Sequence, residues 1–320
     1  MKLVCVDGEE QFRAVLDLEP VRAAGHQLAW YDGTPSDADD WRRRLDGADG
    51  AMLMWGMPEG VLSSAPALRV VSFAGSGAAS YVPMAEAERC GITVCNVPSY
   101  GANAIAEHAV AMAFALARRL CEGDALVRTG AWGPGALSGF ELTGRRMGVV
   151  GVGPIGERAL QLAHGLGMRS FAWTRSPSDA RARELGTEFV ALERLFAASD
   201  VVTLHLAHVP ETEGLVDGRL LGLMQPHALL VNTARAQLVD TEALVSALRR
   251  GAIAGAAIDA FEQEPLPPGH PLLSAPRLLM TPHVAFNTEE ATAELVRLTL
   301  DNLLAFAAGN PRNVYTVRQG

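Results

Sequence analysis

Short apolar runs, each followed by a helical stretch, recur along the chain. In the first hundred residues they cover 3–6, 27–31, 51–55, 70–73 and 92–94, and from residue 147 they cover 147–150, 170–173, 201–206, 228–232, 253–258 and 278–281. Apolar runs without polar alternation are typical of strands that are buried on both faces, as in parallel sheets. The pattern therefore predicts an α/β fold with two units of parallel sheet.

Two long helical segments predict how the chain is divided. One covers 102–119, after a turn-rich segment, and the other covers 288–308, after the last predicted strand. We expect the first to lead from one domain into the next, and the second to return the chain to the first domain. The predicted fold is therefore two doubly wound parallel-sheet domains, one built from residues 1–99 and 288–320 and the other inserted at 100–287. A chain of 320 residues is long enough for both.

Composition and charge exclude several classes of function. The net charge is −9, Lys2 is the only lysine and the arginines form no basic stripe, so nucleic acid is not an expected partner. The longest apolar run, 109–117, is far shorter than the roughly 20 residues that span a membrane, so a membrane partner is not expected either. The cysteines lack the spacing of a metal site, so we expect no bound metal and a reduced, cytoplasmic protein. They are Cys5, Cys90, Cys95 and Cys121.

A glycine-rich turn opens the second set of strands. Gly151, Gly153 and Gly156 stand in Gly-x-Gly-x-x-Gly spacing between a predicted strand and a predicted helix that starts with Pro154 and Ile155. The first glycine permits the tight turn, the second lets the backbone approach a pyrophosphate, and the third lets the helix pack closely on the strand. Amide groups at the helix N-terminus would then face the phosphates. We expect this turn to bind a dinucleotide, the alternative being a glycine-rich turn that binds nothing.

The end of the next predicted strand bears on which dinucleotide is preferred. An acidic side chain at that point accepts the ribose hydroxyls of NAD. Here Thr174, Arg175 and Ser176 follow the strand instead. A guanidinium group pairs well with a phosphate, and the two hydroxyl groups could assist it. The segment favours NADP(H) over NAD(H); the alternative is that Arg175 is an ordinary solvated arginine and both cofactors are accepted.

Three segments near the ends of predicted strands supply a cation, an acid and an imidazole. They contain Arg235, Glu264 and His283. Reduction of a 2-oxo acid needs a hydride donor, a cation for the carboxylate and the polarised carbonyl, and a proton donor at the developing alkoxide. Arg235 and His283 match the last two needs, and a carboxylate from Glu264 would favour the charged imidazole and fix its orientation. Taken singly, Arg235 could equally belong to a surface ion pair, Glu264 could be a loop carboxylate, and His283 could be a helix-capping or core histidine.

Together these segments resemble the D-isomer-specific 2-hydroxyacid dehydrogenase family. The resemblance covers nearly the whole chain and is most specific at 148–156, 231–244, 257–265 and 281–291. It implies an NAD(P)-dependent oxidoreductase in which a Rossmann cofactor domain is inserted in a flavodoxin-like substrate domain. It also implies a small 2-oxo acid or D-2-hydroxy acid as the substrate and a homodimer as the usual assembly.

The resemblance also implies roles for individual residues. Arg235 corresponds to the substrate-binding arginine, Glu264 to the carboxylate that supports the histidine, and His283 to the acid/base. Asp259 corresponds to an acidic position near the nicotinamide and the arginine, and we count it among the cofactor-binding residues.

In the first domain, Ser76 and Gly77 match the loop whose backbone amides receive the substrate carboxylate. A plain turn after the preceding strand is the alternative. Ala79 stands where this loop usually carries aspartate, Ala207 where a proline is common, and Ala236 where a glycine is common. These departures remove no catalytic group, but they leave the loop conformation and the choice of substrate open.

Glyoxylate and hydroxypyruvate are the favoured substrates, because reductases of these acids in the family often use NADPH and carry the same kind of Thr-Arg-Ser segment at the end of the corresponding strand. Formate dehydrogenases of the family pair their histidine with glutamine, so Glu264 argues against that activity. Two alternatives stay open: a phosphite dehydrogenase-like enzyme, which keeps the glutamate, and a non-catalytic, NAD(P)-sensing protein of the corepressor kind, which keeps the fold. The intact set of Arg235, Glu264 and His283 favours an enzyme over such a sensor.

Overall fold

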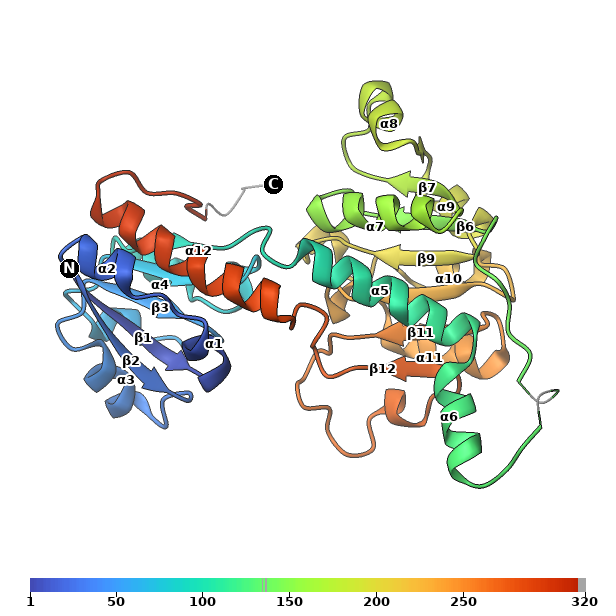
Figure 1. Ribbon diagram of the computed structural model, residues 1–320, viewed down its shortest axis with the longest axis horizontal. Coiled ribbons are helices and arrows are strands. Elements are labelled where there is room, and N and C mark those ends of the chain that lie inside the picture. Colours follow the sequence, from blue (N-terminus) through green and yellow to red (C-terminus); the bar gives the residue numbers. More distant parts are fainter. Residues whose placement is uncertain (134, 136, 316–320) are drawn as a thin grey trace. The chain divides into compact units, whose positions relative to one another are not determined.

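The computed structural model describes residues 1–133, 135 and 137–315 of the 320-residue chain. The chain divides into two compact units, one made of residues 1–101 and the segment from 287 onward, the other of residues 102–286. Each unit is a parallel sheet with helices on its faces (Figure 1). In the part of the chain that the structure describes, no helix has the length and apolar character that crossing a membrane requires.

The first unit contains a five-stranded sheet in which all neighbouring strands are parallel. Its strands are β1 (Lys2–Gly8), β2 (Gln27–Asp32), β3 (Gly50–Leu53), β4 (Val70–Phe73) and β5 (Thr93–Cys95). Their order in the sheet, β2-β1-β3-β4-β5, is that of the flavodoxin-like doubly wound fold. The predicted fold class is confirmed for this unit.

Helices cover both faces of this sheet, and successive side chains of β1 enter different cores because strand side chains alternate. Leu3 and Cys5 pack in a core with residues of α12, whereas Val4 and Val6 pack in a core with residues of α3. The helix that follows the last strand of the chain thus belongs to the first unit. The helices are α1 (Glu10–Ala14), α2 (Glu19–Ala23), α3 (Ala38–Leu45), α4 (Met84–Arg89) and α12 (Glu289–Ala307), with short turns η1 (Leu62–Ser64) and η2 (Ala78–Ser80).

The second unit contains a seven-stranded parallel sheet. Its strands are β6 (Arg146–Val150), β7 (Arg169–Trp173), β8 (Glu188–Phe189), β9 (Val201–Leu204), β10 (Leu229–Asn232), β11 (Gly255–Ile258) and β12 (Leu278–Met280). The order β8-β7-β6-β9-β10-β11-β12 is the Rossmann order 3-2-1-4-5-6 with one further strand, so the predicted fold class is confirmed here too. Only β8 was not expected, because two residues at the sheet edge leave no apolar run.

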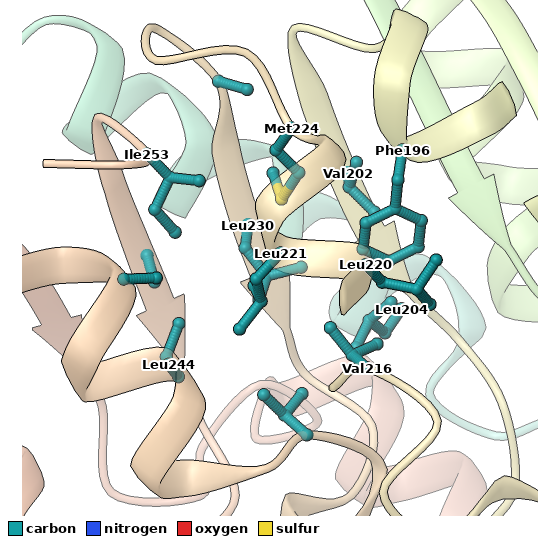
Figure 2. Close-up of a cluster of buried hydrophobic side chains, with 14 of the residues drawn as sticks. Phe196, Val202, Leu204, Val216, Leu220, Leu221, Met224, Leu230, Leu244 and Ile253 are labelled. Atoms are coloured by element: carbon teal, nitrogen blue, oxygen red, sulfur yellow. The ribbon is translucent and has the colours of Figure 1, made fainter. Parts of the chain in front are cut away.

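Helices α5 and α7 pack on one face of this sheet and α9, α10 and α11 pack on the other (Figure 1). Figure 2 shows the second of these cores, where Phe196, Leu221 and Leu244 from the helices meet Val202 and Leu230 from the strands. Close packing on both faces fixes the strands and therefore the loops at their ends. The helices are α5 (Ala102–Ala117), α6 (Leu120–Arg128), α7 (Pro154–Gly165), α8 (Asp179–Leu185), α9 (Leu192–Ala198), α10 (Gly218–Leu223) and α11 (Thr241–Arg250), with short turns η4 (Pro210–Thr212), η5 (Ala236–Leu238) and η6 (Pro271–Ser274).

Candidate active site

Five strands of the second unit end in one row. Val150 pairs with Leu204, Leu204 with Asn232, Asn232 with Ile258, and Ile258 with Met280. The residues that follow this row are therefore brought to the same edge of the sheet, which is where open α/β sheets bind ligands. They are Gly151, His205, Thr233, Asp259 and Thr281.

The glycine-rich turn between β6 and α7 has room for a phosphate. Gly151 has a φ of 94°, and a Cβ on it would lie 2.6 Å from the carbonyl oxygen of His205. A Cβ on Gly156 would lie 2.1 Å from the carbonyl oxygen of Gly151, so α7 needs glycine to pack against the turn. A Cβ on Gly153 would meet no described atom within 4 Å, so the space beside it is open. No described side chain caps the N-terminus of α7, which leaves amides of the first turn, where Ile155 follows Pro154, available to an anion.

Two further polar groups at this edge of the sheet are buried without a partner. Among the described residues, Nδ1 of His205 and Oγ1 of Thr233 make no hydrogen bond, while Nε2 of His205 lies 3.0 Å from the hydroxyl of Thr203. Burial lowers the pKa of His205 to about 4, so its imidazole is neutral at neutral pH. Because buried polar groups are normally hydrogen-bonded, these free atoms at the edge of the sheet fit a polar ligand such as a dinucleotide.

The segment after β7, which the sequence assigns to cofactor preference, lies mostly in solvent. Ser176 is exposed, Thr174 is half-buried, and the exposed guanidinium of Arg175 lies 3.7 Å from the carboxylate of Glu211. An ion pair as exposed as this one contributes little, so the guanidinium remains available to another anion.

Another arginine, Arg181, contacts the glycine-rich turn. Arg181 of α8 donates a hydrogen bond to the carbonyl oxygen of Val152 and lies 2.5 Å from the carboxylate of Glu157 on α7. It ties α8 to the turn and places a cation close to it.

Arg235 follows β10 on a turn that the buried Asn232 holds in place. The Asn232 side chain accepts a hydrogen bond from the backbone N–H of Ala234 at 3.0 Å and donates one to the carbonyl oxygen of Arg235 at 2.8 Å. The guanidinium of Arg235 donates to the carbonyl oxygen of Ala234 at 2.7 Å, and no carboxylate of the described residues lies within ion-pair distance of it. A half-buried guanidinium without a counter-ion can bind a ligand carboxylate.

Glu264 and His283 are in contact. Nδ1 of His283 lies 3.0 Å from Oε1 and 2.9 Å from Oε2 of Glu264, and Oε1 also accepts the backbone N–H of Phe261 at 2.9 Å. Because a carboxylate only accepts, Nδ1 carries the proton of this contact. Nε2 has no partner among the described residues, so it can accept a proton when the ring is neutral and donate one when the ring is charged. The pair therefore has the arrangement of an acid/base imidazole with an orienting carboxylate.

Asp259 lies at the end of β11, between the strands that lead to Arg235 and to His283. Its carboxylate is buried and accepts hydrogen bonds from three groups of the segment 281–285. Its place near a bound nicotinamide remains a prediction.

In the first unit, Ser76 and Gly77 follow β4 and are at least partly exposed. The side chain of Asn96 donates to the carbonyl oxygen of Ser76 at 2.8 Å, and the backbone N–H of Val97 donates to the carbonyl oxygen of Gly75 at 2.9 Å. These bonds hold the loop through its carbonyl groups. Within the described part of the chain, the backbone amides of Ser76 and Gly77 donate to no acceptor, which leaves them available to a ligand.

Comparison with known proteins decides which chemistry this arrangement serves. Residues 110–285 match the model of the D-isomer specific 2-hydroxyacid dehydrogenase NAD binding domain. A glyoxylate reductase of Aeropyrum pernix is 40% identical over 272 residues, which cover 81% of each chain. The chain belongs to the D-isomer-specific 2-hydroxyacid dehydrogenase family. A glycerate dehydrogenase of Methylorubrum extorquens is 35% identical over 298 residues, covering 90% of this chain and 92% of the relative. The structure of a D-2-hydroxyisocaproate dehydrogenase matches with a TM-score of 0.88 and 27% identity over 99% of this chain and 100% of its own.

As a member of this family, the protein is a nicotinamide-dependent oxidoreductase that interconverts 2-oxo and 2-hydroxy acids. The relatives do not favour the phosphite-oxidising or nucleotide-sensing alternatives. In the described residues, no group of three His, Cys, Asp or Glu side chains could hold a metal ion.

The sequence analysis did not select five residues that the structure brings to this site. Three of them end a strand or directly follow one. Their position as polar residues at the end of a buried apolar run could have identified them in the sequence. Arg181 and the helical His108 gave no such signal, because their contacts depend on how helices pack. The five are His108, Arg181, His205, Asn232 and Thr233.

Proposed function

We propose that this dehydrogenase reduces glyoxylate or hydroxypyruvate, with NADPH as the preferred hydride donor. The observation that carries the reaction type is the contact between His283 and Glu264 at the sheet edge that also presents the guanidinium of Arg235. Relatives named glyoxylate reductase support the two-carbon substrate, and the one named glycerate dehydrogenase supports a three-carbon acid.

In the proposed reaction, the bound nicotinamide supplies the hydride for the keto carbon. Arg235 binds the substrate carboxylate and polarises the keto oxygen. His283 donates the proton on Nε2 to the developing alkoxide, and Glu264 holds the ring through Nδ1 and stabilises its positive charge. In the oxidative direction the neutral Nε2 of His283 accepts the hydroxyl proton. The backbone amides of Ser76 and Gly77 are proposed to bind the substrate carboxylate as well.

These roles predict different kinetic effects for two substitutions. His283→Ala removes the proton donor, so kcat should fall by about 10²–10⁴-fold while the Kd for NADPH is retained. Arg235→Ala removes the group that binds the carboxylate and should chiefly raise KM for the 2-oxo acid. Wild-type rates from both purified variants would overturn the proposed mechanism.

The preference for NADPH is proposed to rest on Arg175, assisted by the hydroxyl groups of Thr174 and Ser176. Asp259 and the glycine-rich turn are proposed to bind the rest of the cofactor. A hydrogen-bonded pair between the guanidinium and a 2′-phosphate is worth roughly 1.5–3 kcal/mol. Arg175→Ala should therefore lower kcat/KM for NADPH at least about tenfold and leave that for NADH unchanged. The exposed Arg183 of α8 offers the matched control, and Arg183→Ala should change neither value.

A homodimer in the cytoplasm is the proposed state of the enzyme. Three large apolar side chains on and after α6 are exposed, Leu120 at 57%, Val127 at 56% and Trp132 at 86%. Exposed apolar side chains gathered on one segment favour an interface. The four cysteines are free, which supports a reducing compartment. Light scattering of the wild type should give the mass of two chains, and Leu120→Asp should shift it toward one.

The function itself is tested by following reduced-nicotinamide absorbance with NADPH or NADH and a panel of acids. The panel contains glyoxylate, hydroxypyruvate, pyruvate, phenylpyruvate and 2-oxoisocaproate. We expect the highest kcat/KM with NADPH and either glyoxylate or hydroxypyruvate. A higher value with another acid would overturn the substrate assignment, and equal use of NADH would overturn the cofactor assignment.

A further inference from the structure

The carboxylate of Asp259 is hydrogen-bonded to a side chain before His283 and to the backbone after it. Oδ1 accepts the hydroxyl of Thr281 at 2.5 Å and the backbone N–H of Val284 at 3.0 Å, and Oδ2 accepts the backbone N–H of Ala285 at 2.9 Å. The side chain of Asp259 is 1% exposed, so these bonds are shielded from water. Hydrogen bonds to an ionised acceptor are stronger than neutral ones.

His283 needs this support because its backbone conformation is unfavourable. Its φ is 53°, in the left-handed region that is costly for residues with a Cβ. Such conformations persist only where the surrounding structure imposes them. The bonds from Asp259 to residues before and after His283 impose it and so fix the direction in which the imidazole leaves the chain.

A histidine from a distant helix completes this arrangement. His108 of α5 lies 173 positions before Thr281 in the chain, yet its Nε2 is 3.1 Å from the Thr281 hydroxyl and 3.8 Å from Oδ1 of Asp259. A hydroxyl has one proton to donate, and the 2.5 Å contact assigns that proton to Asp259. His108 must therefore donate its Nε2–H to Thr281. The three side chains form a directed chain of hydrogen bonds from His108 through Thr281 to Asp259.

We propose that His108 is a positioning residue for proton transfer, acting through Thr281 and Asp259 on the segment that carries His283. The inference rests on the proposed role of His283 as the acid/base. The donor at Nε2 orients the Thr281 hydroxyl toward Asp259, and the oriented hydroxyl keeps the carboxylate in place for the amides of Val284 and Ala285. His108 touches none of the reacting groups in this arrangement.

The test is a double-mutant cycle on His108 and Thr281, followed by three readouts: kcat, the Kd for NADPH, and amide hydrogen exchange of residues 281–286. Thr281→Val and His108→Ala should each lower kcat by about tenfold, because small displacements of a catalytic group are costly. The Kd for NADPH should stay as in the wild type. Thr281→Ser, which keeps the hydroxyl, should recover most of the lost kcat. Glu107→Gln, on the same helix, is the matched control for His108.

The double variant Thr281→Val with His108→Ala should be no slower than Thr281→Val alone, because His108 acts through the threonine. Effects that multiply would overturn the proposal, as would wild-type kcat in Thr281→Val. Both variants keep the Asp259 carboxylate, so a parallel loss of NADPH affinity would also overturn the proposal, because His108 and Thr281 would then act on the cofactor and not on the segment that carries His283.

Hydrogen exchange separates this proposal from the proposed function. Exchange at Val284 and Ala285 should quicken in both single variants, and unchanged exchange would overturn the proposal whether or not the enzyme turns over. A wild-type protein that reduces none of the 2-oxo acids, but whose variants exchange faster, would refute the function and support the positioning.

Discussion

Substitution of glycines in the cofactor turn separates cofactor binding from folding. Gly153 has extended backbone dihedrals that alanine can adopt, and a Cβ on it would enter open space. Gly156 lies within α7, and a Cβ on it would come within 2.1 Å of the backbone carbonyl oxygen of Gly151. If the open space beside Gly153 receives the pyrophosphate, Gly153→Ala should impair binding without impairing the fold, and Gly156→Ala should impair the fold.

The expected magnitudes differ enough to be measured. Gly153→Ala should change the free energy of unfolding by less than about 1 kcal/mol, since the N-cap preference for glycine over alanine and the entropy gained by alanine oppose each other. It should raise the Kd for NADPH at least about tenfold, which is about 1.4 kcal/mol. Gly156→Ala should destabilise the second unit by about 1–3 kcal/mol, the usual cost of overpacking, and lower its Tm by several degrees.

The assay combines a fluorescence titration with NADPH and a calorimetric melt of each variant. Gly165→Ala is the matched control, because it lies at the other end of α7 and its Cβ would meet no described atom within 4 Å. That variant should keep the wild-type Kd and gain up to about 1 kcal/mol in stability. A wild-type Kd in Gly153→Ala would refute the assignment of the pyrophosphate site, and a wild-type Tm in Gly156→Ala would refute the packing argument.

Two further predictions concern His205 and Glu264. Burial lowers the pKa of His205 from 6.5 to about 4. The contribution of the neutral imidazole to stability is therefore present above pH 6.5 and is lost as the pH falls toward 4. At 1.36 kcal/mol per tenfold change in proton affinity, the loss in the free energy of unfolding is about 3 kcal/mol. Urea unfolding at pH 7, 5.5 and 4 should show that loss in the wild type and not in His205→Gln. The same pH dependence of the free energy of unfolding in both proteins would contradict the prediction. Glu264→Gln should lower kcat by about 10–100-fold, because the ring loses its charged partner, with an unchanged Kd for NADPH. The exposed neighbour Glu262→Gln should behave as the wild type, and a Glu264→Gln enzyme that matched it would remove the carboxylate from the mechanism.

The parts of the fold that could be predicted from the sequence are those set by local pattern. The apolar runs placed the strands other than β8 to within two residues at each end, because strands buried on both faces leave an uninterrupted apolar signal. The glycine spacing marked the turn after β6 because the tight approach of the chain at Gly151 and Gly156 leaves no room for a side chain. Glu264 and His283 were paired from the chemistry that reduction of a 2-oxo acid needs and from the family resemblance, and their contact is present.

Contacts between side chains on distant elements could not be predicted in the same way. Asp259 was expected near the cofactor, and nothing in the sequence near it indicated that its carboxylate holds the segment 281–285. His108 is one of three polar residues in the otherwise apolar helix α5, and its contact with Thr281 arises because α5 packs against β11. Such contacts depend on strand register and helix packing, which no local pattern records.

Strand register connects the apolar pattern to the chemistry at the edge of the sheet. Ala256 and Ala257 of β11 face opposite cores, and both pair in register with residues of β12. A slip of one residue would exchange the faces of every side chain on the strand, so the two cores exclude such a slip. That register brings Asp259 beside Thr281. The buried apolar residues of the sheet therefore determine which polar residues meet where the strands end, although they contribute no functional group themselves.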